Sequence, residues 1–221
     1  MKTNEVVFII DKSGSMHDLV GDTIGGFNSV LKEQKANNND GNVLVSTVLF
    51  NEQRKVIHDR EDIANVREME SKDYVPAGST ALIDAIGYSI KHIDSVYKYI
   101  REEDIPEHTL FVIITDGYEN ASHVYSSDEV KKMIKDRQDN KNWEFLFIGA
   151  NIDAVETANN IGIDRDYAFN YIADRIGNSI VYDCISEKIS TVKKAVRGCK
   201  SSNESLCKIT KDHKKRAKVK K

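Results

Sequence analysis

Apolar runs of six to nine residues alternate along the chain with longer stretches whose apolar residues recur every three or four positions. The apolar runs are rich in Val, Ile and Phe and predict buried strands. They lie at residues 5–10, 42–50, 109–115 and 143–148. The longer stretches predict amphipathic helices. They lie at residues 16–35, 81–100, 127–140 and 173–197.

Weaker patterns extend this alternation. Residues 53–58 follow the second strand too closely for a helical crossover, so we expect an antiparallel hairpin there. A short helix is expected to open at Asn151 or Asp153 and to end at Gly162, before a weak last strand at residues 167–170. The pattern predicts an α/β fold: a doubly wound, Rossmann-like sheet, mostly parallel with one antiparallel edge strand, and helices on both faces.

The composition is that of a soluble domain, with 40% hydrophobic and 30% charged residues in a chain of 221. We expect one domain over residues 1–199. No apolar run approaches the roughly 20 residues that span a bilayer. The first apolar run is too short for the core of a signal peptide. The expectation is therefore a cytoplasmic protein without a membrane contact.

Cysteine usage points the same way. The three cysteines, Cys184, Cys199 and Cys207, are odd in number, which argues against a disulfide framework. Cys199, Cys207 and His213 fit no compact zinc-binding pattern.

Charge is uneven along the chain. Residues 208–221 hold eight Lys or Arg and one acid, whereas the remainder holds 24 basic and 34 acidic residues, a net charge of −10. Residues 200–221 are therefore expected to form a basic, disordered tail. Contact of this tail with nucleic acid is an alternative.

Polar side chains gather at three junctions that precede predicted helices. Residues 11–15 (DKSGS) follow the first strand, residues 115–117 (TDG) end the central strand, and residues 76–80 (PAGST) lead into the 81–100 helix. Ligands of open α/β sheets bind beyond the carboxyl ends of the strands, where the strand order reverses. If the order is 3-2-1-4-5-6, Asp11 and Asp116 face one crevice.

The candidate ligands at these junctions offer only oxygen, with no Cys or His among them. The candidate ligands are two carboxylates and three hydroxyls, from Asp11, Ser13, Ser15, Thr80 and Asp116. Such a set selects a hard cation, Mg²⁺ by preference with Mn²⁺ or Ca²⁺ as alternatives. Two carboxylates leave the shell of such an ion incomplete, so an acidic group from outside could enter it.

These motifs resemble those of von Willebrand factor A (vWA) domains. Residues 11–15 match the D-x-S-x-S motif of the family's metal-ion-dependent adhesion site (MIDAS). Residues 78–82 with Asp84 resemble its threonine loop, and residues 115–117 with Glu119-Asn120 resemble its aspartate loop. Gly25-Gly26-Phe27-Asn28, with Gln34, is similar to the first helix of small bacterial, intracellular members. The resemblance covers about residues 4–170 and the final helix.

The resemblance implies a function and a role for each ligand. Ser13 and Ser15 would contact the metal directly, and Asp11 and Asp116 directly or through water. The contact of Thr80 would differ between states of low and high affinity. An Asp or Glu of a protein partner would complete the octahedron, so the chain would be a binding module rather than an enzyme.

Other readings remain open. Asp11, Ser15 and Thr80 could act only as helix caps, and Asp84 could serve only the dipole of its helix or a supporting hydrogen bond. A Mg²⁺-dependent phosphohydrolase or phosphotransferase is a second function, although Ser13 stands where such an enzyme would need another carboxylate. The partner, the biological process and the oligomeric state cannot be read from the sequence.

Overall fold

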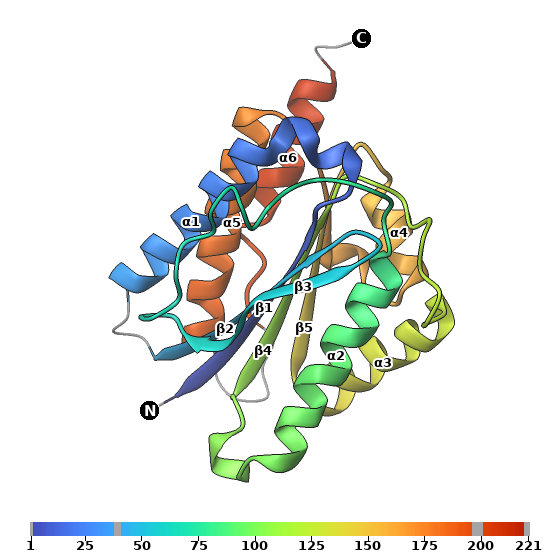
Figure 1. The fold of residues 1–221 in the computed structure, drawn as a ribbon. Helices are drawn as coiled ribbons and strands as arrows, with labels where there is room; N and C mark the ends of the chain where they lie inside the picture. The colour runs from blue at the N-terminus through green and yellow to red at the C-terminus, as the bar shows by residue number, and fades with distance from the viewer. Residues whose placement is uncertain (1, 38–40, 196–200, 219–221) are drawn as a thin grey trace.

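The computed structural model describes residues 2–37, 41–195 and 201–218. Six strands form one sheet in the order β3-β2-β1-β4-β5-β6 (Figure 1). The strands are β1 (Thr3–Asp11), β2 (Asn42–Phe50), β3 (Arg54–Asp62), β4 (His108–Thr115), β5 (Trp143–Ala150) and β6 (Ala168–Tyr171). Every neighbouring pair is parallel except β2 with the edge strand β3. The predicted sheet, its single antiparallel edge and its order are confirmed.

Helices cover both faces of this sheet (Figure 1). The α-helices are α1 (Val20–Ala36), α2 (Leu82–Tyr99), α3 (Ser127–Asn140), α4 (Ala154–Asn160), α5 (Arg175–Lys194) and α6 (Cys207–Ala217). Short 3-10 helices are η1 (Gly14–Leu19), η3 (Glu102–Asp104) and η4 (Arg165–Tyr167). One core joins the sheet to α1, α5 and the start of α6, and the other joins it to α2, α3 and α4. The predicted fold class is confirmed.

Strand β4 shows how the apolar runs build both cores. All eight of its residues are buried. Leu110, Val112 and Ile114 enter the core beneath α1 and α5. Phe111 and Ile113 enter the core beneath α2 and α3. Because successive side chains of a strand point to opposite faces, a central strand covered on both faces needs an unbroken apolar run.

The predicted boundaries hold with local differences. The helix expected over residues 16–35 begins as the 3-10 turn η1 and becomes α-helical only at Val20. Strand β3 runs to Asp62, beyond the expected end at residue 58, and its pairing with β2 contains a bulge. The long β3 was missed because its second half is charged and lies at a sheet edge, where polar side chains reach solvent.

Helix caps follow the expected chemistry. Ser126 accepts a hydrogen bond from the backbone of Glu129, whose side chain accepts from Ser126 in return, a complete capping box. Asp153 caps α4, and Gly162 follows that helix with a φ of +87°. A positive φ favours glycine because it lacks a β-carbon.

The C-terminal segment departs from the expected disordered tail. Helix α6 packs against α5 and β6. Leu206 and Ile209, three positions apart, are buried in the core next to α5. The expectation of disorder is therefore wrong for residues 201–218, because Leu206, just before the basic helix α6, and Ile209 within it are buried against the body.

A buried polar anchor precedes α6. Lys188 on α5 is fully buried and donates hydrogen bonds to Glu144 Oε2 at 2.7 Å and to Ser201 Oγ at 2.5 Å. Ser201 N–H donates to Glu144 Oε1 at 2.9 Å. These bonds tie the C-terminal segment to β5 and α5. The expected boundary at residue 199 lies outside the described residues.

Two further expectations concern membranes and glycines. Within the described residues, no helix combines the length and the apolar character that crossing a bilayer requires. From the sequence, Gly25 and Gly26 are expected to compensate for their cost within a helix by letting that helix pack closely on the sheet, and a β-carbon at Gly26 would lie 2.0 Å from the Tyr182 ring on α5. Gly26 therefore lets α1 approach α5, a helix rather than the sheet.

Candidate metal site

The predicted ligands lie at the carboxyl end of the sheet, where the strand order reverses. β1 and β4 are neighbours, and the chain winds outward from them in opposite directions. Asp11 is the last residue of β1, and Asp116 directly follows β4. The loop of residues 63–81 joins β3 to α2 and carries Thr80 (Figure 1). Side chains from three separate loops can therefore meet here.

The first loop turns back on the Asp11 carboxylate. Asp11 is fully buried, and its Oδ1 accepts a hydrogen bond from Ser13 N–H at 2.7 Å. The hydroxyls of Ser13 and Ser15 lie 3.1 Å apart. The short loop of residues 11–15 therefore places the two serine oxygens side by side.

The other two loops complete the group. Ser15 Oγ donates to Asp116 Oδ1 at 2.5 Å, across 101 residues of sequence. A β-carbon at Gly117 would lie 3.0 Å from Thr80 Oγ1, 3.6 Å from Ser15 Oγ and 3.9 Å from Asp11 Oδ2. Oxygen atoms from three loops therefore surround one small space, which only a glycine at 117 leaves free. The structure brings together all five predicted residues, Asp11, Ser13, Ser15, Thr80 and Asp116.

Backbone hydrogen bonds fasten the first loop to the threonine loop. Gly14 N–H donates to Gly78 O at 3.0 Å, and Ala77 N–H donates to Lys12 O at 2.9 Å. Gly78 has a φ of +73°, which a residue with a β-carbon adopts only with strain. The two loops therefore form one unit around Asp11.

Asn120 fastens the threonine loop to the aspartate loop. Its Oδ1 accepts from Thr80 N–H at 2.8 Å, and its own N–H donates to Thr80 O at 3.0 Å. Sequence reasoning assigned Asn120 no contact, because its partner lies 40 residues away. The cluster of polar residues after Asp116 was the only available signal.

Glu119 and Asp84 secure the same two loops further out. Glu119 accepts hydrogen bonds from Ile83 N–H at 2.8 Å and from Ser122 N–H at 2.8 Å. Asp84 accepts from the backbone of residues 123–125. Asp84 therefore supports the loop by hydrogen bonds, which is one of the alternatives that the sequence left open. None of these bonds joins Asp84 to the five oxygen donors.

Two residues beneath Asp11 were also missed. Thr115 Oγ1 donates to Asp11 Oδ2 at 2.6 Å, and Tyr74 Oη donates to Asp11 O at 2.5 Å. Both are fully or almost fully buried. Thr115 holds the Asp11 carboxylate and Tyr74 holds the Asp11 backbone carbonyl, and no sequence pattern marks either as more than a core residue.

The two carboxylates lack a cationic partner. Burial raises the pKa of Asp11 above its ordinary value, against hydrogen bonds from Thr115 and Ser13 that lower it. Burial likewise raises the pKa of Asp116. Within the described part of the chain, both carboxylates are bonded by hydroxyls and N–H groups, and neither forms an ion pair. Buried carboxylates are ordinarily paired with a cation or bound to a metal.

The donor set fits a hard cation. Adjacent ligands of an octahedral Mg²⁺ lie roughly 2.9 Å apart, given bonds of about 2.0–2.1 Å. The two serine oxygens, 3.1 Å apart, match this spacing. Among the residues that the structure describes, no three His, Cys, Asp or Glu side chains are grouped to hold a metal, so the hydroxyls must supply part of any such shell. Cys184 and Cys207 are both free thiols.

Comparison with known proteins gives structural matches only. No family model and no curated protein matches the chain. A von Willebrand factor type A structure from Catenulispora acidiphila is similar, at 16% identity and a TM-score of 0.55, over 86% of this chain and 43% of that one. Proximal thread matrix protein 1 from the mussel byssus, with a zinc-occupied MIDAS motif, is similar at 16% identity and a TM-score of 0.55, over 84% and 45%.

A third structure is of similar length to the chain. The conserved hypothetical protein BatB from Bacteroides thetaiotaomicron matches at 14% identity and a TM-score of 0.57, over 86% of this chain and 99% of that one. The chain spans less than half the length of the first two structures. At this low sequence identity, the similarity shows only that the backbones follow the same path. The strand order of the chain agrees with that shared fold. The chain therefore has the fold of von Willebrand factor type A domains.

Proposed function

We propose that the chain is a metal-dependent interaction module that binds a carboxylate of a protein partner. The observation that carries the proposal is the pair of buried carboxylates, Asp11 and Asp116, which converge with three hydroxyl groups and form no ion pair within the described residues. A site of this composition suits Mg²⁺, with Mn²⁺ or Ca²⁺ as alternatives.

The ligand roles follow the family's pattern. Ser13 and Ser15 are proposed as direct ligands, Asp11 and Asp116 as ligands that act directly or through water, and Thr80 as the ligand from the third loop. Thr115, Tyr74 and Asn120 would orient these groups. When bound, the cation would supply coordination positions that a carboxylate from outside can enter.

Two observations support an interaction partner. One structural relative carries a zinc-occupied MIDAS motif and is a matrix protein of the mussel byssus. Ser15 is exposed, so a protein partner can reach the oxygen group from solvent. We also propose that the protein is bacterial and cytoplasmic, as the sequence resemblance implies.

Binding is proposed in preference to catalysis. Phosphoryl transfer from an aspartate needs a positioned proton donor. Ser13 stands two residues after Asp11, and its oxygen neighbours another hydroxyl rather than a second carboxylate.

The test is Mg²⁺ binding by Asp11→Ala, measured by isothermal titration calorimetry. We expect the binding heat to be lost, because Asp11 is central to the oxygen group, while circular dichroism shows a retained fold. Asp18→Ala is the matched control, since Asp18 lies in the adjoining 3-10 helix η1 with a fully exposed side chain, and it should bind as the unchanged protein does. Equal Mg²⁺ affinity of Asp11→Ala and the unchanged protein would refute the site.

A further inference from the structure

Exposed apolar side chains stand on the loops that carry the candidate metal site. Among the described residues, six large apolar side chains are well exposed. Three of them stand on loops that build the site: Val75 at 61%, Tyr118 at 58% and Val124 at 57% exposure. Singly exposed apolar residues are common, whereas a group around a binding site marks a contact surface.

Hydrogen bonds of these residues and their neighbours place the three on different loops around the oxygen group. Val75 follows Tyr74, which donates to Asp11 O, and precedes Ala77, whose N–H donates to Lys12 O at 2.9 Å. Val75 therefore lies beside the first loop.

The other two lie beyond Asp116. Tyr118 is two residues further on, and its Oη accepts from Asp153 N–H at 3.2 Å, so its ring leans toward the start of α4. Val124 N–H donates to Asp84 Oδ1 at 3.0 Å, which holds it beside the first turn of α2. The apolar surface thus flanks the site toward β5 and toward α2.

Three exposed acids lie at the same end of the sheet as the candidate site. Asp18 lies in η1, Glu52 between β2 and β3, and Asp153 just before α4, and Lys12 is half-buried. A divalent cation would balance Asp11 and Asp116, and Lys12 lies near Glu52 and can balance only one of the other three acids. The whole chain carries a net charge of −3. A partner segment rich in acidic residues would therefore be repelled.

We propose that the partner presents one isolated Asp or Glu, flanked by aliphatic or aromatic residues, and not an acidic stretch. This inference rests on the proposed function, because the single acid is the group that enters the metal site. Val75, Tyr118 and Val124 would bury the flanking apolar side chains. The surrounding acids would select against a second carboxylate.

The test is a selection from short synthetic peptides on the immobilised full chain in Mg²⁺. One library has a fixed central Asp with randomised flanks, and a matched library has a fixed central Asn. We expect retained peptides only from the Asp library, elution by EDTA, enrichment of aliphatic and aromatic flanks, and depletion of acidic ones. Burying one apolar side chain corresponds to a preference of roughly tenfold.

Variants separate this surface from the metal site. The triple variant Val75→Ser, Tyr118→Ser, Val124→Ser should keep its Mg²⁺ affinity in calorimetry but lose the flank preference. Tyr99→Ser is the matched control, because Tyr99 is 81% exposed at the last residue of α2, the helix end away from the site, and this variant should keep the preference.

Each outcome decides one point. Retention of Asp peptides with acidic flanks, or with no flank preference, would overturn the inference and leave the proposed function standing. A flank preference that survives the triple variant would also overturn it. Equal retention of the Asp and Asn libraries would refute the proposed function itself, because no carboxylate would then be required.

Discussion

Two hydrogen bonds of opposite sense join Asn120 to the backbone of Thr80. Together with the bonds of Gly14 to Gly78 and of Ala77 to Lys12, they connect all three loops around the oxygen donors. A site assembled from loops needs such supports, because a ligand that is free to move loses part of its binding energy to ordering. At the scale of single residues, the hydrogen bonds that hold the three loops are therefore as specific as the ligands themselves.

Asn120→Ala should weaken Mg²⁺ binding roughly 10- to 100-fold, the usual cost of losing a group that orients a ligand. The variant removes the acceptor for Thr80 N–H and frees the threonine loop. Calorimetry measures the affinity, and Asn120→Asp, which keeps an acceptor oxygen, should restore binding. Unchanged affinity in Asn120→Ala would show that Thr80 is held by other contacts.

The five oxygen donors could be named from the sequence, since three motifs of serine, threonine and aspartate precede predicted helices, although the same residue types also cap helices. Thr115 and Tyr74 were not, because hydroxyls within apolar runs look like core residues until their partners are known. Both donate to Asp11, across 104 and 63 residues respectively. Contacts of that separation leave no periodic trace in the sequence.

At the scale of elements, the loop of residues 63–81 has a weak sequence pattern but a clear structural anchor, the ion pair of Asp73. Asp73 is almost fully buried and accepts two hydrogen bonds from Arg67, at 2.6 and 3.0 Å. Lys55 Nζ on β3 lies 3.3 Å from Asp73 Oδ1. Tyr74, the next residue, contacts Asp11. The ion pair therefore holds the loop that carries Thr80 against the sheet.

The hydrogen bonds from Arg67 hold the pKa of Asp73 well below its ordinary value. A folded-state pKa below the unfolded value of about 3.9 adds stability that is present above that pH and is lost as the pH falls through the folded-state pKa. Asp73→Asn should lower the unfolding free energy at neutral pH by about 1–3 kcal/mol. In urea titrations, the difference from the unchanged protein should shrink below pH of about 4.

Asp59→Asn is the control for this experiment. Asp59 lies on β3 and pairs with His92, but both side chains are about half exposed, so little stability depends on the pair. If Asp73→Asn and the unchanged protein differed by the same amount at every pH, the ionised form of Asp73 would not be the source of the stability.

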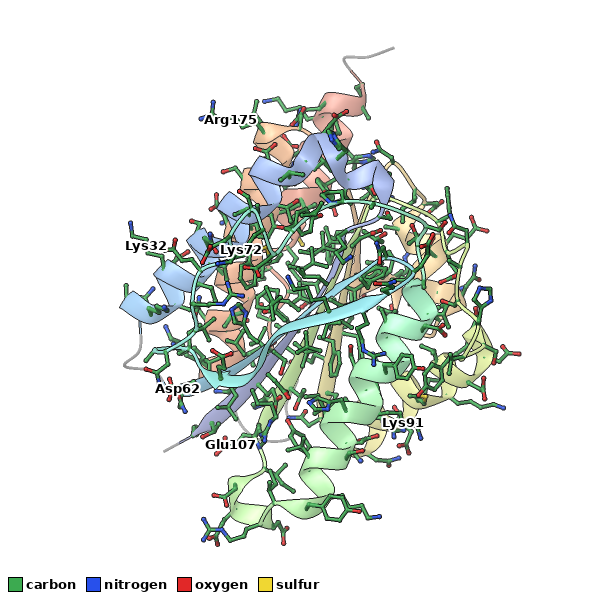
Figure 2. All side chains as sticks on the ribbon, in the orientation of Figure 1. Lys32, Asp62, Lys72, Lys91, Glu107 and Arg175 are labelled. Atoms are coloured by element: carbon green, nitrogen blue, oxygen red, sulfur yellow. The ribbon has the colours of Figure 1, made fainter. Side chains whose placement is uncertain are left out.

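At the scale of the whole molecule, the C-terminal segment belongs to the same core as α1 and α5. Leu206 and Ile209 are buried there, and Ser201 closes the network of Lys188 and Glu144. In the view of Figure 2, α1, α5 and α6 lie on one flank of the sheet, and α5 packs against both α1 and α6. Part of the positive charge is also paired, since Lys208 and Arg216 contact acids of α5 and its cap. Fewer basic side chains remain for nucleic acid, which stays an alternative.

Removal of residues 201–221 should lower the unfolding free energy by about 3–6 kcal/mol, given about 1.5–3 kcal/mol for each of two buried apolar side chains. The loss should appear as a lower urea midpoint in a single transition, because one core is shared. Removal of residues 219–221 alone is the control and should leave the midpoint in place. Equal midpoints for the long truncation and the unchanged protein would mean that this segment folds independently of the body.

The sequence by itself determined the alternation of strands and helices, the fold class and the oxygen chemistry of the site. These follow from local properties, since burial on one or both faces imposes a period on the chain and hard cations require oxygen ligands. Only the tertiary structure decided that Asn120 is hydrogen-bonded to the backbone of Thr80, and that residues 201–218 pack on the body. It also decided that Thr115 and Tyr74 bond the carboxylate and the backbone carbonyl of Asp11. Each of these features depends on a few contacts between residues that are distant in the sequence. A segment that packs through two apolar side chains has no sequence pattern that distinguishes it from a solvated tail.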